Sequence, residues 1–157
     1  MVRELKFIAA ALVIAGAALF ASCLNVEKGR VLEVLNQESG KVYGKWLLGE
    51  SGEFSIEFIH SVHQSPVLET FKIEDGKIRP LTVRFHAFGA GMPSTLEEGE
   101  TMVQDGDAVI VAGFNASYSA LNYIVGTVSD HILLINNQNI SLRDLCGRNA
   151  HISIQVK

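Results

Sequence analysis

Residues 58–69, with the sequence FIHSVHQSPVLE, hold the side chains of this chain that are best suited to chemistry. A glutamate can accept a hydrogen bond from an imidazole and fix its tautomer, and a neighbouring serine would complete a Ser-His-Glu arrangement. Glu69, His60 and Ser61 are the candidates. Adjacent strand residues point to opposite faces, however, and no glycine elbow surrounds Ser61 or Ser65. The pattern favours a structural His60–Glu69 pair and leaves ligand binding and catalysis as alternatives, with no catalytic residue assigned.

The His60–Glu69 pair follows from a predicted β-hairpin. Two segments alternate with period two and so place these side chains on one face of each strand: Phe54, Ile56, Phe58 and His60 in the first, and Val67, Glu69, Phe71 and Ile73 in the second. If Phe58 lies opposite Phe71, then His60 lies opposite Glu69. Directly opposed Cβ atoms are about 4.5–5.5 Å apart, so this register predicts a contact between the imidazole and the carboxylate.

The histidines also raise the question of a metal. His60, His63, Glu69 and His86 offer enough nitrogen and oxygen ligands for zinc. His60 and His63 nevertheless lie across a predicted loop without the spacing that a helix would fix. We therefore expect no metal site and no cofactor, and we expect His63 and His86 on the solvated surface.

A second candidate for recognition is the loop FGAGMPS at residues 88–94. Gly89 and Gly91 permit positive φ angles or close backbone approach, and Pro93 stiffens the exit of the loop. The loop is interpreted either as a structural turn or as a nest of amides for an anion. Two tyrosines, Tyr118 and Tyr123, could line a pocket or cap the core.

The N-terminus predicts export. Arg3 and Lys6 precede an apolar run from Phe7 to Leu24, and small residues lead to Cys23. This layout is typical of a signal peptide and resembles a bacterial lipobox, with lipidation at Cys23. The alternatives are an uncleaved anchor and simple cleavage. Residues 1–24 are therefore a signal peptide or membrane anchor, residues 25–29 a tether, and residues 30–157 an exported domain held at the cell membrane.

The sequence of the exported part predicts an all-β fold. Turn residues separate short segments rich in Val, Ile, Leu and Phe, which indicates an antiparallel β-sandwich or partly open barrel of about nine strands behind an N-terminal apolar helix. The predicted strands are Arg30–Leu35, Val42–Leu48, Glu53–His60, Val67–Ile73, Ile78–Phe88, Ala108–Phe114, Asn122–Val128, His131–Ile135 and His151–Val156. Pro80 implies that its strand lies at the edge of a sheet or contains a bulge. Residues 141–146 could form one helical turn. The net charge of −4 gives no footprint for nucleic acid. Cys146 is expected to be a small buried residue rather than a nucleophile.

The segments FIHSVHQSPVLETFKI and VRFHAFGAGMPS resemble the bacterial domain-of-unknown-function family numbered eighteen-fifty. The motif positions carried by the resemblance are His60, Ser61, Val62, Pro66, Glu69, Gly89, Ala90, Gly91 and Pro93. His63 departs from the family, which often has an acidic residue there, and this counts against His63 as a metal ligand. Lipidation at Cys23 is no constant family feature and depends on its own residues.

The resemblance implies small proteins with an apolar N-terminal segment, encoded beside TRAP transporters of the TAXI type, which move small carboxylates. It therefore implies an accessory or binding module whose partner is the transporter's membrane subunit or solute-binding protein. The recognition candidates are His60, Ser61, Glu69, Gly89, Gly91 and Pro93. The alternatives are a periplasmic hydrolase that uses His60 and Glu69 and a purely structural envelope lipoprotein.

Overall fold

The computed structural model describes residues 31–86 and 95–157 of the chain. The predicted leader and tether with Cys23, the apolar helix, and the loop with Gly89, Gly91 and Pro93 lie outside these residues. Within the two described ranges, no helix is long and apolar enough to cross a membrane.

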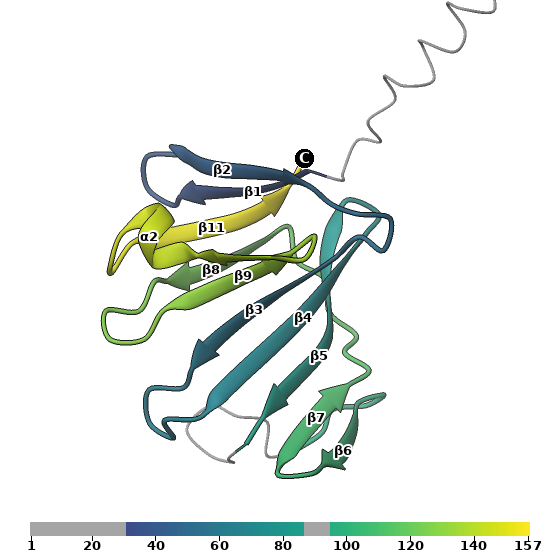
Figure 1. The fold of residues 1–157 in the computed structure, drawn as a ribbon. Coiled ribbons are helices and arrows are strands. Elements are labelled where there is room, and N and C mark those ends of the chain that lie inside the picture. Colours follow the sequence, from purple (N-terminus) through teal and green to yellow (C-terminus); the bar gives the residue numbers. More distant parts are fainter. Residues whose placement is uncertain (1–30, 87–94) are drawn as a thin grey trace, which may run out of the picture.

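The described residues form two antiparallel sheets arranged as in a β-sandwich (Figure 1). The smaller sheet has four strands in the order β2-β1-β11-β8. Their bounds are Val42–Leu47 for β2, Val31–Asn36 for β1, His151–Val156 for β11 and Ala120–Ile124 for β8. The first and last strands of the domain are thus paired side by side, and β8 forms one edge of this sheet.

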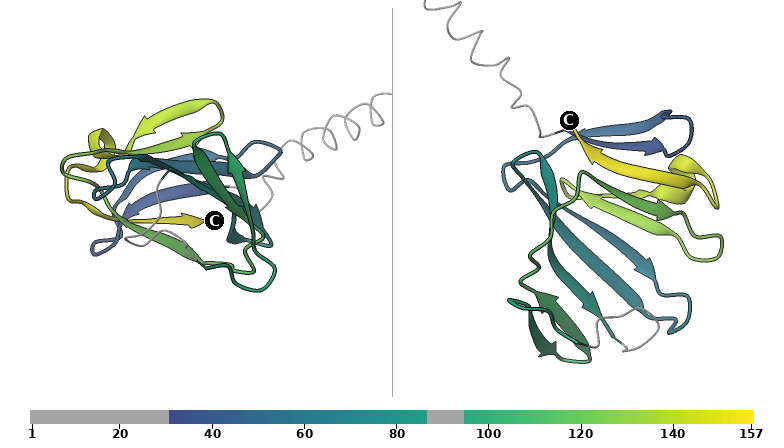
Figure 2. Two further views of the ribbon diagram at one scale, coloured as in Figure 1. Left: turned by 90° about the horizontal axis from the view of Figure 1, so that it is seen from below. Right: turned by 180° about the vertical axis from the view of Figure 1, so that it is seen from behind.

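The larger sheet has seven strands in the order β10-β9-β3-β4-β5-β7-β6. Strands β7 and β6 of this sheet lie at the opposite end of the molecule from β1 and β2 of the smaller sheet (Figure 1). The view from behind in Figure 2 shows the same arrangement. The bounds are Gln138–Ser141 (β10), His131–Ile135 (β9), Glu53–Ile59 (β3), Pro66–Glu74 (β4), Lys77–Phe85 (β5), Ala108–Ala112 (β7) and Thr101–Asp105 (β6).

The all-β prediction is confirmed, with two strands more than expected. Each of the nine predicted segments contributes a strand, and β6 and β10 are additional. Both are the hairpin partners of predicted strands, across turns with positive φ at Gly106 and at Asn136 and Asn137. The strand predicted at residues 122–128 lies earlier, at 120–124. The chain turns at Gly126, where a Cβ atom would lie 2.0 Å from the Ser129 carbonyl oxygen.

The core lies between the two sheets and is filled by alternating residues. Leu32 and Val34 of β1, Ile152 and Ile154 of β11, and Ile56 of β3 are fully buried. Period two on each strand places these side chains on the inner face, where burial of apolar area stabilises the fold. A smaller apolar cluster lies on the β4–β5–β7 half of the larger sheet, formed by Val67, Phe85, Val109 and Val111.

The predicted helical turn is helix α2, Leu142–Cys146. Ser141 is its N-cap: its hydroxyl accepts a hydrogen bond from the Asp144 amide at 2.9 Å. Leu142 is buried in the core, and Cys146 is half-buried against it. Burial raises the pKa of the Cys146 thiol to about 11, so the thiol is protonated at neutral pH and a poor nucleophile.

The bulge predicted at Pro80 is present in the β4–β5 ladder. Thr70 pairs with Thr82, whereas the next residue, Phe71, pairs with Pro80, so Leu81 is the extra residue. A bulge changes the parity of a strand. Val83 and Pro80, three positions apart, therefore both lie opposite inward-facing residues of β4, and both reach the space between the sheets.

Candidate functional site

The predicted register of the β3–β4 hairpin is wrong by four residues. Phe58 pairs with Val67 rather than with Phe71, and Glu69 pairs with Ile56 rather than with His60. Glu69 thus lies four positions along β3 from His60, about 13 Å at a rise of about 3.3 Å per residue. The alternation of residue types determines which side chains share a face of the sheet. A register shift of four residues keeps the same side chains on that face, so the alternation does not distinguish the two registers. The expected His60–Glu69 contact therefore does not form.

His60 instead organises the turn between the strands. Its backbone amide donates to the Ser65 carbonyl at 2.9 Å, which sets the register. Its Nδ1 accepts hydrogen bonds from the amides of Val62 and His63, each at 3.3 Å. The imidazole rings of His60 and His63 stack with their centroids 5.0 Å apart. Exposed Ser61 lies in the same turn, where its carbonyl accepts a hydrogen bond from the Gln64 side chain.

His63 and His86 do not lie on a fully solvated surface. Both side chains are partly buried, and His86 Nδ1 lies 3.5 Å from an Asp107 carboxylate oxygen. Across the described part of the chain, no three His, Cys, Asp or Glu side chains come together to hold a metal ion.

Glu69 has a partner that the sequence did not reveal. It lies on the inner face of β4, and its Oε2 accepts a 2.7 Å hydrogen bond from the Tyr123 hydroxyl on β8. This bond joins the two sheets, between residues 54 positions apart. Burial raises the pKa of the Glu69 carboxyl, and the bond from Tyr123 opposes part of that shift. Burial and the nearby carboxylate also raise the pKa of Tyr123, which keeps the phenol protonated.

Glu69 and Tyr123 lie in the wall of a cavity of about 340 Å³ between the sheets. The other lining residues are Phe71, Pro80, Val83, Phe114, Tyr118, Leu121 and Asn122. We call this space the intersheet cavity. Its walls come from β4 and β5 of the larger sheet, from β8 of the smaller one, and from the connection before β8. Mostly apolar walls with a few convergent polar groups are typical of small-molecule sites.

His131 supports the polar end of the intersheet cavity. Its ring lies between Phe58 and Tyr123, with centroid distances of 5.1 and 5.8 Å. The Gly126 amide donates to His131 Nδ1 at 3.3 Å. Burial lowers the pKa of His131, with Asp130 acting in the opposite direction, so the imidazole is neutral at pH 7. His131 therefore positions the Tyr123 ring without adding a charge beside it.

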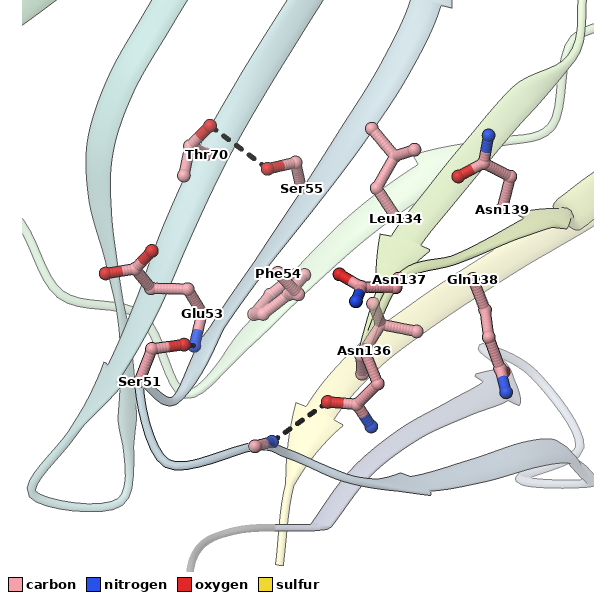
Figure 3. A pocket seen from close by; sticks show the side chains of 12 residues that line it. Ser51, Glu53, Phe54, Ser55, Thr70, Leu134, Asn136, Asn137, Gln138 and Asn139 are labelled. Atoms are coloured by element: carbon pink, nitrogen blue, oxygen red, sulfur yellow. Dashed lines mark hydrogen bonds between the residues drawn. The ribbon is translucent and has the colours of Figure 1, made fainter.

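A second cavity, about 500 Å³, lies mainly on the outer face of the larger sheet (Figure 3). We call it the outer groove. Ser55 and Thr70 share a hydroxyl–hydroxyl bond of 3.0 Å across β3 and β4. Asn136 Oδ1 accepts from the Gly49 amide at 2.9 Å, and its Nδ2 donates to the Leu47 carbonyl at 2.6 Å. The Asn136 bonds tie the β9–β10 turn to the β2–β3 connection, so their role is structural.

The intersheet cavity combines a few polar side chains with a mostly apolar wall. Its polar lining groups are the side chains of Glu69, Asn122 and the two tyrosines, and the remaining lining residues are apolar. Tyr118 and Tyr123 line this cavity, as one of the two sequence interpretations predicted. The pairing of Tyr123 with Glu69 could not be predicted from the spacing of these residues in the sequence. The sequence feature that could have indicated Tyr123 is a tyrosine on the apolar face of a short strand.

No curated protein and no solved structure matches the chain in sequence or in fold. A model of one protein family does match, over residues 54–142. These residues run from β3 to the first residue of α2 and include His60, Glu69, Tyr123 and the intersheet cavity. The family is described as a domain of unknown function, DUF1850, and the chain belongs to it.

Proposed function

We propose that this DUF1850 protein is an exported, membrane-tethered binding module that acts as an accessory to a TAXI-type TRAP transporter. The observation that carries the binding function is the Tyr123–Glu69 bond in the wall of the intersheet cavity. The leader, with Arg3, Lys6 and the apolar run to Cys23, supports the tether. The family resemblance supports the transporter as partner.

The cost of burying Glu69 supports a functional reason for its presence. A carboxylate on an apolar wall loses hydration, and one hydrogen bond replaces only part of it. An apolar residue of similar size would stabilise the folded protein more. The geometry gives no comparable support to a hydrolase that uses His60 and Glu69, because the hairpin register separates these side chains.

The charge of the intersheet cavity bears on how the module would assist the transporter. Small carboxylates are bound by Arg, Lys or clustered amides, whereas the described residues lining the cavity include no Arg and no Lys. A carboxylate would meet Glu69 as a like charge. The intersheet cavity therefore does not suit the transported carboxylate, and we assign the module a contact with the membrane subunit or the solute-binding protein instead.

Affinity purification of the full-length protein from native membranes in a mild detergent tests the proposal. We expect the membrane subunit or the solute-binding protein to co-purify, and we expect deletion of the gene to reduce carboxylate uptake. A Cys23→Ala variant distinguishes the two kinds of tether. If the tether is a lipid on Cys23, we expect the variant to be released from the membrane; if it is an uncleaved anchor, we expect the variant to stay bound. Failure to co-purify together with unchanged uptake would reject the transporter as partner. It would favour a purely structural envelope protein.

A further inference from the structure

We propose that the intersheet cavity binds a small molecule that carries a protonated amine on an apolar body. This inference rests on the proposed binding function and names its class of ligand. A volume of about 340 Å³ is near the lower end of the range of about 300–1,000 Å³ for small-molecule sites. The ligand is therefore a compact molecule with one charged end.

The charge of the wall selects a cation. Glu69 is the acidic residue among the described lining residues, and neither Lys nor Arg is present there to neutralise it. Neighbouring His131 is neutral at pH 7 and packs against Tyr123. An ammonium group would give the partly buried carboxylate the electrostatic partner that it lacks.

The hydrogen bonds indicate where the ammonium group binds. Tyr123 donates to Oε2 of Glu69, and no described residue donates to Oε1. An ionised carboxylate accepts several hydrogen bonds, so Oε1 is left for a ligand N–H. A bond between an ammonium and a carboxylate is stronger than a bond between neutral groups. A quaternary ammonium, which has no N–H, would leave this oxygen without a donor.

The apolar walls suit the body of such a ligand. Phe71, Pro80, Val83 and Leu121 line the cavity around the Glu69–Tyr123 pair. Phe114, Tyr118 and Tyr123 add aromatic rings, whose faces attract cations as well as apolar groups. One carboxylate among several aromatic rings distinguishes amines from carboxylates and from neutral alcohols of the same size.

Three probes of similar size separate the ligand classes: phenethylamine, hydrocinnamate and phenethyl alcohol. Full-length protein in detergent is titrated with each probe by calorimetry, with empty micelles as the blank. We expect phenethylamine to bind at least about tenfold more tightly than the other two, because only its ammonium group pairs with Glu69. Equal or tighter binding of hydrocinnamate, or no binding of any probe, would overturn the proposal.

Matched variants locate the site. We expect Glu69→Gln to lower the affinity for phenethylamine to that for phenethyl alcohol, and Glu53→Gln, which removes the same charge from the exposed outer face of β3, to leave it unchanged. Unchanged affinity in a folded Glu69→Gln variant would reject the site. If that variant does not fold, Leu121→Trp decides: it keeps the carboxylate and fills the cavity, so retained binding would reject the site. Co-purification with the transporter is a separate measurement. A failure to co-purify would reject the transporter as partner without affecting the proposed ligand class, and a failure to bind amines would reject the ligand class without affecting the proposed partner.

Discussion

The Tyr123 hydroxyl donates a 2.7 Å hydrogen bond to Oε2 of Glu69 and so connects edge strand β8 of the smaller sheet to β4, the middle strand of the larger sheet. Both side chains come from the inner faces of their strands, where most neighbours are apolar. The bond therefore combines two roles, since it holds the sheets together and fixes the orientation of the acidic group in the cavity wall. Substitutions at either end should separate these roles.

Removal of the Tyr123 hydroxyl should destabilise the protein. Tyr123→Phe keeps the ring and leaves Glu69 buried without its donor, which we expect to lower the free energy of unfolding by about 1–3 kcal/mol at pH 7. Urea unfolding followed by circular dichroism measures the change. The control is Tyr118→Phe, at a half-exposed tyrosine of the same cavity, for which we expect a change within about 0.5 kcal/mol. Equal losses in the two variants would contradict the structural role of the Tyr123–Glu69 bond.

The stability contributed by Glu69 should fall as the pH rises. Burial raises the folded-state pKa of this carboxyl above its ordinary value of about 4.3, so the folded protein holds the proton more tightly than the unfolded chain. The contribution is complete below about pH 4 and is lost as the pH rises through the raised pKa. Unfolding free energies of the wild type and of Glu69→Gln, measured from pH 4 to pH 8, should show the wild type losing stability relative to the variant. A constant difference would show that the carboxyl titrates normally.

Glu33 on β1 should show the opposite dependence. Its side chain is only 1% exposed, and its carboxylate oxygens lie 2.6 Å from Lys45 Nζ and 3.4 Å from Lys157 Nζ. The bond from Lys45 is the main reason why its pKa is lowered; burial opposes this shift, and Gln155 and Lys157 support it. The stabilisation is present above about pH 4.3, the unfolded value, and is lost as the pH falls through the lowered pKa. Acid titration of the wild type against Glu33→Gln should therefore show the wild type losing its advantage below about pH 4. An advantage that persists to the lowest pH would contradict this assignment.

Most of the fold could be predicted because the residues on the inner faces alternate. The stripes at Phe54, Ile56 and Phe58 and at Leu32 and Val34 mark buried strands. The helical turn at residues 141–146 and the bulge beside Pro80 also follow from local chemistry. Strands β6 and β10 were missed because their residues are mostly polar and exposed. They form because a hairpin turn brings each of them beside an apolar strand, β7 for β6 and β9 for β10. This pairing depends on both strands of the hairpin and cannot be predicted from the polar segment alone.

The candidate site could be predicted only in part. The sequence identified Glu69 as an acidic break on an apolar face, and this is where the cavity lies. It also singled out Tyr118 and Tyr123. The partner of Glu69 could not be found, because residue alternation determines the face of a side chain but not its register. The register was set by the His60–Ser65 backbone bond, and the approach of β8 depends on how the two sheets pack.

A double-mutant cycle should confirm that His60 and Glu69 are independent. We expect the effects of His60→Ala and Glu69→Gln on the free energy of unfolding to add within about 0.5 kcal/mol, because Glu69 pairs with Ile56 and lies far along the strand from His60. The cycle of Tyr123→Phe with Glu69→Gln is the positive control, with an expected coupling of about 0.5–3 kcal/mol. Strong coupling between His60 and Glu69 would support the register first predicted from the sequence.

Asn136 should be the most sensitive residue of the outer groove. Its side chain bonds both the Gly49 amide and the Leu47 carbonyl, and its backbone has a positive φ of 50° that asparagine tolerates better than alanine (Figure 3). Asn136→Ala should lower the free energy of unfolding by about 1–3 kcal/mol. Gln138→Ala, at an exposed neighbour in the same groove, serves as the control, with an expected change within about 0.5 kcal/mol. Phenethylamine affinity should be unchanged in both variants, because the outer groove and the intersheet cavity share no lining residue. A loss of affinity in a folded Asn136→Ala variant would mean that the amine binds in the outer groove instead.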